Sequence, residues 1–352
     1  MSDEPPSGSG QNRPAAIILG CAGEVLSADE RRFFRDADPA GFILFHCNCR
    51  TPDRVRRLVA ELRDSVGRAD APVLIDQEGG RVARLRPPGW RAYPAAGHLA
   101  MLADPLAAEA AGLAGRLIAD DLARLGITVD CAPVLDLPSA GADPVIGDRA
   151  WGTEAERVTR LGRAFCDGLL EGGVLPVLKH IPGHGRATVD SHRACPRVDA
   201  SRTELSARDF APFRALGHMP WAMTAHILYA AIDDDAAATL SHRVISGAIR
   251  GEIGFSGVLV SDDLSMGALG GTLGERTSRA LAAGCDLALH CNGDLREMTQ
   301  VAAAAAPLSS AAWQRIARAE TMRTASCREF DRVAAEARFD ALLRLGDGAG
   351  PG

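Results

Sequence analysis

Short apolar runs alternate with helix-like segments along most of this chain, and the alternation limits the folds that are open to it. There are eight such runs, and several are continuously apolar, which is typical of parallel strands covered on both faces. Parallel strands joined by helices form either a closed barrel or an open, doubly wound sheet. The predicted strands occupy residues 15–19, 41–45, 72–75, 127–134, 175–178, 221–225, 256–260 and 285–289.

The segments between these runs carry the signals of amphipathic helices. Thr51 and Pro52 supply an N-cap and a proline at the first helical position, and the apolar residues Val55, Leu58 and Leu62 that follow share one face. Further helices are expected at residues 104–125, 154–170, 201–216, 241–253, 272–283 and 295–306, with extra helices outside the barrel at 309–345.

This pattern predicts an α/β protein, a single (β/α)8 barrel of the TIM type with extra C-terminal helices. An open doubly wound sheet would carry a glycine-rich phosphate loop after its first strand, whereas residues 20–26 read GCAGEVL. We expect the barrel domain to span residues 15–345, between a disordered tail at 1–14 and a flexible tail at 346–352.

Charge and hydropathy argue against two kinds of partner. The 39 basic and 45 acidic residues give a net charge of −6, so there is no basic field to attract nucleic acid. No stretch approaches the 18 apolar residues that a membrane span needs. The N-terminus has no apolar signal core, and the nine cysteines are odd in number and scattered, so we expect a cytoplasmic protein with reduced thiols.

Polar and ionisable residues follow five of the predicted strands, where the reactive groups of such barrels lie. They include Lys179, the only lysine among the 39 basic residues, which suits a position where a compact ammonium is needed. We infer an active site at these strand ends. The residues concerned are Asp76, Gln77, Glu78, Arg81, Asp136, Lys179, His180, His226, Asp262 and Asp263.

A carboxylate on a rigid strand end and a histidine on a glycine-rich loop are the groups from which we derive the chemistry. Asp262 is a candidate nucleophile, and His192 is a candidate proton donor that Asp190, two residues earlier, can orient. A carboxylate opposite a general acid can displace a group from a sugar's anomeric carbon with retention, although histidine is an unusual acid there. Asp76, Arg84, Arg149 and Lys179 would provide hydrogen bonds to a polyhydroxylated substrate.

The same residues lie in motifs that resemble those of glycoside hydrolase family 3. The resemblance is to its bacterial β-N-acetylglucosaminidase branch, the NagZ-like enzymes of peptidoglycan recycling, and it runs in order from about residue 16 to 295. Ile181 stands where phenylalanine is commoner, and the proline often found before ATLS is missing. The matching stretches are IDQEGGRVARL (75–85), APVLDL (132–137), DPVIGDRAWG (143–152), KHIPGHGRATVDSH (179–192), MTAHILY (223–229) and VSDDLSM (260–266).

The resemblance implies roles for individual residues. Asp262 would form the glycosyl-enzyme ester, and His192 would be the acid/base, paired with Asp190. It implies a substrate with a non-reducing N-acetylglucosamine β-1,4-linked to 1,6-anhydro-N-acetylmuramic acid, hydrolysed in the cytosol without a cofactor or metal by an enzyme that we expect to be monomeric. The substrate-binding residues would be Asp76, Arg84, Arg149, Lys179 and His180.

Two other functions compete with this one. A metal-dependent amidohydrolase would need a His-x-His pair after the first strand, where this chain has Gly20-Cys21-Ala22-Gly23. A sugar-binding protein without activity is disfavoured because the nucleophile and the acid/base pair are both present. Phosphate could replace water as the acceptor.

Three further residues near the motifs have open or structural roles. We expect Asp263 to be a structural carboxylate, because neighbouring strand residues face opposite ways. His226 could bind substrate or support Asp262, and His184 has no assigned role.

Overall fold

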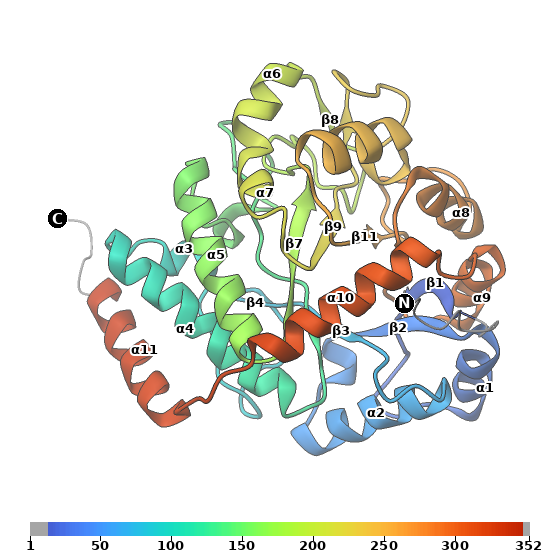
Figure 1. Ribbon diagram of the computed structural model, residues 1–352, viewed down its shortest axis with the longest axis horizontal. Helices are drawn as coiled ribbons and strands as arrows, with labels where there is room; N and C mark the ends of the chain where they lie inside the picture. Colours follow the sequence, from blue (N-terminus) through green and yellow to red (C-terminus); the bar gives the residue numbers. More distant parts are fainter. Residues whose placement is uncertain (1–12, 348–352) are drawn as a thin grey trace, which may run out of the picture.

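Eight parallel strands close into a barrel in the computed structural model, which describes residues 13–347 (Figure 1). Their order around the barrel is β1-β12-β11-β9-β7-β6-β3-β2, and β2 pairs with β1 to complete the ring. The predicted (β/α)8 barrel is therefore confirmed. The strands are β1 (Ala15–Leu19), β2 (Pro39–Leu44), β3 (Val73–Ile75), β6 (Val129–Asp130), β7 (Leu175–Ile181), β9 (Trp221–Thr224), β11 (Val258–Asp263) and β12 (Leu287–His290).

Each predicted strand overlaps one strand of the barrel, but the fourth strand is much shorter than expected. The sequence predicts a strand over residues 127–134, whereas β6 ends at Asp130. Pro133 has no N–H group to continue the ladder, and only Val134 pairs again, in an isolated bridge with Lys179.

Helices form the outer layer, and α1 is one that the sequence analysis did not predict. Ser27 and Glu30 begin it with a capping box, in which the Glu30 carboxylate accepts the Ser27 N–H at 2.9 Å. The helices are α1 (Ala28–Ala37), α2 (Pro52–Ser65), α3 (Ala96–Leu99), α4 (Asp104–Ala123), α5 (Ala155–Glu171), α6 (Arg202–Glu204), α7 (Ala211–Ala215), α8 (Leu273–Ala283), α9 (Leu295–Ala304), α10 (Ser310–Ser326) and α11 (Arg332–Asp347). Wider π-helical turns span Leu205–Asp209 and Arg243–Glu252, and 3₁₀ turns span His46–Asn48, Gly147–Arg149 and Ala238–Leu240.

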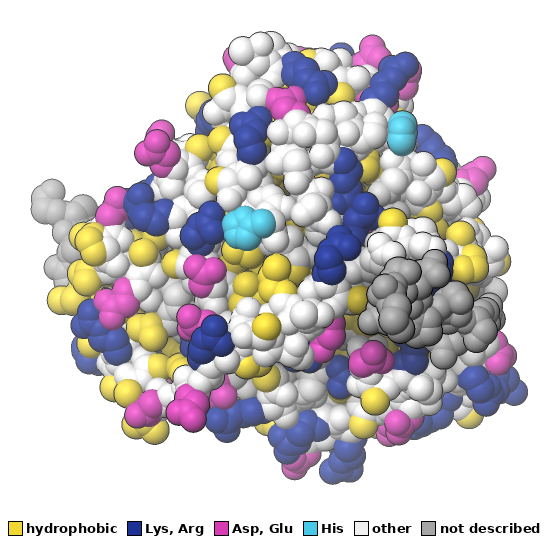
Figure 2. Space-filling model, in the orientation of Figure 1, with side chains coloured by type: hydrophobic (Ala, Val, Ile, Leu, Met, Phe, Trp, Pro, Cys, Tyr) yellow, Lys and Arg dark blue, Asp and Glu magenta, His cyan; other side chains and the backbone are white. Residues whose placement is uncertain are grey.

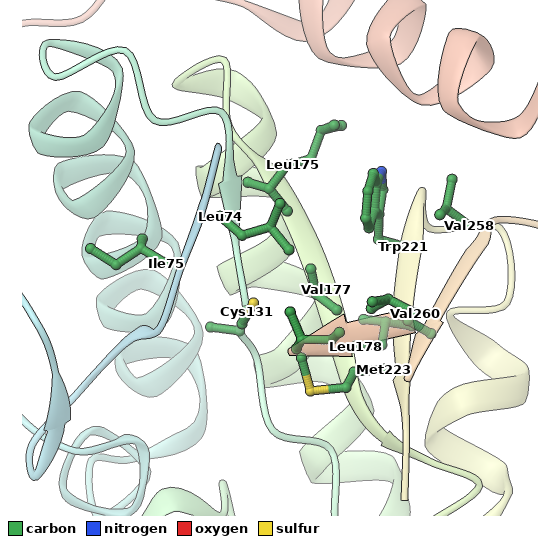
Figure 3. Close-up of a cluster of buried hydrophobic side chains, with 14 of the residues drawn as sticks. Leu74, Ile75, Cys131, Leu175, Val177, Leu178, Trp221, Met223, Val258 and Val260 are labelled. Atoms are coloured by element: carbon green, nitrogen blue, oxygen red, sulfur yellow. The ribbon is translucent and has the colours of Figure 1, made fainter. Parts of the chain in front are cut away.

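The extra C-terminal helices that the sequence predicts are α10 and α11. Helix α10 crosses the face of the molecule drawn in Figure 1, and it lines a cavity together with Leu175 and Trp221 at the starts of β7 and β9. Figure 3 shows apolar side chains from several strands, among them Leu74, Val177, Trp221 and Val260, filling the barrel interior. The cavity between α10 and the strand starts at this end has a volume of about 230 Å³, and a separate cavity opens at the C-terminal ends of the strands, where the reactive groups of such barrels lie.

The sequence analysis also gave expectations about nucleic acid, membrane spans and the two tails. Basic and acidic side chains are interspersed on the face drawn in Figure 2, without a continuous basic area there. No helix between residues 13 and 347 is both long and apolar enough to cross a membrane. The predicted tails at 1–14 and 346–352 lie outside the described residues apart from Arg13, Pro14 and the end of α11, which continues to Asp347.

Candidate active site

A cavity of about 280 Å³ opens at the C-terminal ends of the strands, where the sequence analysis placed an active site. This volume is close to the lower end of the usual range for small-molecule sites, about 300–1,000 Å³. Seven of the eight predicted site residues line it, and the eighth, Asp190, contacts the lining residue His192. The seven are Asp76, Arg84, Arg149, Lys179, His180, His192 and Asp262.

Asp262 lies near the end of β11, on a rigid part of the barrel. Its Oδ1 accepts the Asp263 N–H at 2.8 Å. Burial opposes ionisation of this carboxyl, but the nearby His226 and His180, together with the Asp263 N–H, hold its pKa below the usual range. Asp262 is therefore an ionised carboxylate at neutral pH, with Oδ2 available to a ligand.

The two residues beside Asp262 have structural contacts. The Asp263 carboxylate accepts the Ser265 N–H at 3.0 Å and the Ser265 hydroxyl at 2.6 Å, and it lines the cavity together with Asp262, although neighbouring strand residues were expected to face opposite ways. His226 is fully buried, with Nε2 at 2.9 Å from the Asp263 carbonyl oxygen and Nδ1 at 2.7 Å from the Thr239 hydroxyl. Since both ring nitrogens are engaged within the protein, His226 supports the end of β11.

His192 and Asp190 lie on the loop after β7. The Asp190 Oδ1 atom is 2.8 Å from His192 Nδ1 and also accepts the His192 backbone N–H at 2.9 Å. Although partial burial opposes ionisation of Asp190, these two bonds lower the pKa of its carboxyl. The loop rests on the segment after β11, where Gly267 N–H donates to the His192 carbonyl at 3.2 Å. A side chain at Gly267 would collide with that carbonyl, at 2.8 Å from its Cβ, so glycine permits the close approach.

Five charged side chains form a continuous chain of alternating sign along one side of the site. Arg84 Nη2 is 2.8 Å from Asp76 Oδ2, and Lys179 Nζ is 2.9 Å from Asp76 Oδ1. Lys179 Nζ is also 2.7 Å from Glu78 Oε1, and Glu78 in turn binds Arg149. Burial alone would raise the pKa of Asp76, but Lys179 and Arg84 hold it well below its usual range. All five groups are therefore charged at neutral pH.

Two carboxylates with buried side chains, Glu78 and Asp136, were placed at the active-site strand ends from the sequence but were given no individual role. The Asp136 Oδ2 atom is 2.7 Å from His180 Nδ1, while its Oδ1 accepts the His180 and His184 backbone N–H groups at 3.1 and 2.6 Å. Both carboxylates follow a predicted strand, which is the position that placed them at the site, but the sequence does not show which groups they contact. Neither lines the cavity, so they hold the groups that do.

The sequence Asp-Gln-Glu-Gly-Gly that follows β3 contains the first strand and the start of the turn of a short hairpin. Its strands are β4 (Gln77–Gly79) and β5 (Val82–Ala83). The Gln77 side-chain oxygen accepts the Arg84 and Leu85 N–H groups at 2.9 and 3.0 Å, which fixes Arg84 above Asp76. Gly79 has a φ of +97°, and a Cβ there would lie 2.3 Å from the Pro94 oxygen, so only glycine allows this turn.

His184 also lines the cavity. Its Nε2 is 3.2 Å from the Ser191 hydroxyl, and burial, aided by the neighbouring His180, lowers its pKa to about 4. It is therefore a neutral imidazole at pH 7. Among residues 13–347, three potential metal-ligand side chains come together at Asp233, Asp234 and Asp235, and none of these lines the cavity.

The cavity thus combines an ionised carboxylate, a carboxylate–histidine pair and a row of fixed polar groups. Comparison with known proteins points to one family with such a site. The model of the glycosyl hydrolase family 3 N-terminal domain matches residues 20–321. Proteins named beta-hexosaminidase are similar in sequence: that of Alkalilimnicola ehrlichii is 40% identical over 283 residues, covering 78% of this chain and 80% of its own. That of Pseudomonas aeruginosa strain LESB58 is 39% identical over 281 residues, covering 79% and 82%.

Solved structures agree with this comparison. NagZ from Neisseria gonorrhoeae, in complex with N-trifluoroacetyl-D-glucosamine, superposes with a TM-score of 0.81 at 30% identity, covering 96% of this chain and 99% of its own. A family 3 β-N-acetylglucosaminidase from Paenibacillus sp. str. FPU-7 gives a TM-score of 0.77 at 34% identity. This chain is 96% covered but spans 62% of that longer protein. The chain therefore belongs to glycosyl hydrolase family 3 and is a glycosidase of the β-hexosaminidase type.

Proposed function

We propose that this enzyme is a retaining exo-β-N-acetylglucosaminidase that works by double displacement, with Asp262 as the nucleophile and His192 as the acid/base. The observation that carries the proposal is that Asp262 and the Asp190–His192 pair contribute to the same cavity. A nucleophilic carboxylate and a proton donor are the two groups that retention requires.

The contacts suggest which atoms act in each step. Asp262 Oδ1 is occupied by the Asp263 N–H, so Oδ2 attacks the anomeric carbon and forms the ester. His192 Nδ1 is held by Asp190, so Nε2 carries the proton to the glycosidic oxygen as the bond to the anomeric carbon breaks. Water then attacks the ester while Nε2 takes up its proton, which regenerates both the Asp262 carboxylate and the protonated His192.

Binding of one sugar ring is proposed for the remaining polar lining. Asp76, Arg84, Arg149, Lys179 and His180 offer fixed donors and acceptors to the hydroxyl groups of a neutral sugar. A cavity of about 280 Å³ is consistent with a single terminal ring, as an exo-acting enzyme requires. The names of the relatives support N-acetylglucosamine as that ring.

We further propose a natural substrate and a cellular role for the enzyme. The substrate would be N-acetylglucosamine β-1,4-linked to 1,6-anhydro-N-acetylmuramic acid, with or without its peptide, and the enzyme a cytoplasmic monomer in peptidoglycan recycling. The support is the likeness to NagZ over nearly the full length of both chains.

The test is turnover of this defined disaccharide followed by proton NMR. We expect free N-acetylglucosamine that appears first as the β-anomer, because two inversions give net retention. The α-anomer appearing first would contradict a covalent mechanism. Sugar 1-phosphate formed in phosphate buffer would identify phosphate as the acceptor, and cleavage of chitobiose without cleavage of this disaccharide would refute the proposed substrate.

A further inference from the structure

Glu78 contacts two of the proposed substrate-binding residues, Lys179 and Arg149, and has no assigned role of its own. Its Oε1 lies 2.7 Å from Lys179 Nζ and 2.8 Å from Arg149 Nη2, and its Oε2 lies 2.9 Å from Arg149 Nε. The side chain is 7% exposed. Lys179 and Arg149 line the cavity, whereas Glu78 does not, so its carboxylate meets both cations from behind.

The position of these two cations requires an anion between them. Both bond the same oxygen of Glu78, so their nitrogen atoms cannot be further apart than the two distances combined. Two buried cations at such a distance repel each other strongly, because little water is present to screen them. Lys179 also has Asp76 as a partner, but Arg149 has its two-point contact with Glu78 alone among the ion pairs of the described residues.

These contacts also answer whether Glu78 could replace His192 as proton donor. A donor must reach the glycosidic oxygen from the cavity and must carry a proton. Glu78 is outside the lining and its oxygens are directed at cations, which keep the pKa of its carboxyl low despite burial. The carboxylate is therefore a permanent acceptor.

We propose that Glu78 is a positioning residue for the glycosidase, which holds Lys179 and Arg149 together at the spacing that one sugar ring needs. This rests on the proposed binding role of those two cations. Glu78 lies on β4 of the hairpin, directly before the turn at Gly79 and Gly80, and its carboxylate reaches Lys179 near the end of β7. The residue acts through Lys179 and Arg149 and does not touch the substrate itself.

The test uses Glu78→Gln in the full-length enzyme. Glutamine has one acceptor oxygen, so its amide group must face one of the cations and one contact is lost. We expect KM for an aryl N-acetylglucosaminide, and Kd for N-acetylglucosamine measured by calorimetry, to rise by roughly 10- to 150-fold. The value of kcat should change much less, because lost binding that is equal in the ground and transition states appears in KM.

A matched control separates positioning from loss of stability. Asp286 is a buried carboxylate between Arg250, at 2.8 Å, and Arg315, at 2.7 Å, and it lies outside the cavity lining. Asp286→Asn should lower Tm to a similar extent and leave KM unchanged. If Glu78→Gln fails to fold, Glu78→Asp serves in its place. It keeps the charge but has a shorter reach, so KM should rise above the wild-type value by less than the change expected for Glu78→Gln.

Single and combined variants distinguish failure of this proposal from failure of the proposed site. Glu78→Gln should add little to the effect of Lys179→Ala and Arg149→Ala combined, because its role passes through them. If KM is unchanged in Glu78→Gln but raised in Lys179→Ala, the positioning role of Glu78 is refuted and the proposed binding site stands. An unchanged KM in Lys179→Ala and in Arg149→Ala would overturn the binding site on which the proposal rests.

Discussion

The carboxylate of Asp190 binds His192 twice through one oxygen, at 2.8 Å from the ring Nδ1 and 2.9 Å from the backbone nitrogen. The two contacts fix both the ring and the loop that carries it. Since Nδ1 is occupied, the other ring nitrogen is the one available to a ligand in the cavity. The orientation of the proposed acid, His192, is therefore fixed by contacts within residues 190–192.

Removal of His192 should depend on the leaving group. An alkoxide needs protonation as the bond breaks, whereas nitrophenolate can depart without it, and general acid catalysis contributes about 10²–10⁴-fold. His192→Ala should lose a factor of that order on the disaccharide in the first step and much less on a nitrophenyl glycoside. Pre-steady-state kinetics on both substrates measures the difference, and equal losses on the two would mean that His192 only binds substrate.

Asp190→Asn should give a milder form of the same pattern. Asparagine can still accept the ring and backbone N–H groups, but it lacks the charge that stabilises a protonated ring. We expect a loss of roughly tenfold on the disaccharide. The measurement is kcat/KM on poor and good leaving groups, with Asp199→Asn as a control, because that carboxylate pairs with Arg197 and is absent from the cavity lining. A loss as large on nitrophenyl glycosides as on the disaccharide would contradict the assignment.

The two adjacent carboxylates of β11 should behave differently. Asp262→Asn removes the attacking oxygen, so turnover should fall by about 10⁴-fold or more while sugar binding persists. A slow 2-fluoro sugar should label Asp262, as seen by mass spectrometry of the peptide. Asp263→Asn should instead lower stability by about 1–2 kcal/mol, because it weakens the bonds to Ser265. Labelling at Asp263 would show that the roles are exchanged.

The pH dependence should reflect the low pKa of Asp262. Attack needs the ionised form, and this carboxyl is held below its usual range despite burial. Its acid limb in kcat/KM for a nitrophenyl substrate should therefore appear only as the pH falls below about 4, the ordinary value for Asp. Recovery of activity after return to pH 7 controls for acid unfolding. An acid limb with a midpoint above 5 would be inconsistent with Asp262 as the sole group whose ionisation limits that step.

Chelation should leave the activity unchanged. The proposed steps need only a carboxylate and an imidazole, and the acidic group Asp233, Asp234 and Asp235 is absent from the cavity lining. The enzyme assayed after dialysis against a chelator should match the untreated enzyme. Loss of activity that zinc or manganese restores would refute the mechanism and favour a metal-dependent hydrolase.

Much of the fold is determined by short stretches of sequence. The apolar run at residues 15–19 is β1 with the same limits, and Thr51 and Pro52 begin α2 as their types predict. These features depend on neighbours a few residues apart, and so do the positions at strand ends and the Asp190–His192 pair. Helix α1 was missed although the Ser27–Glu30 capping box is a local signal of its start, because Phe34 is its one fully buried hydrophobic residue.

Only the tertiary structure decided which charges pair in the site. Glu78 and Arg149 are 71 residues apart, and Asp136 and His180 are 44 apart, so their contacts exist because the barrel closes. The chain has 38 arginines besides Lys179, and the sequence alone cannot say which of them a buried carboxylate meets. Pairing of distant charges depends on where the folded backbone puts them and on how much water it excludes, and neither is written in local patterns.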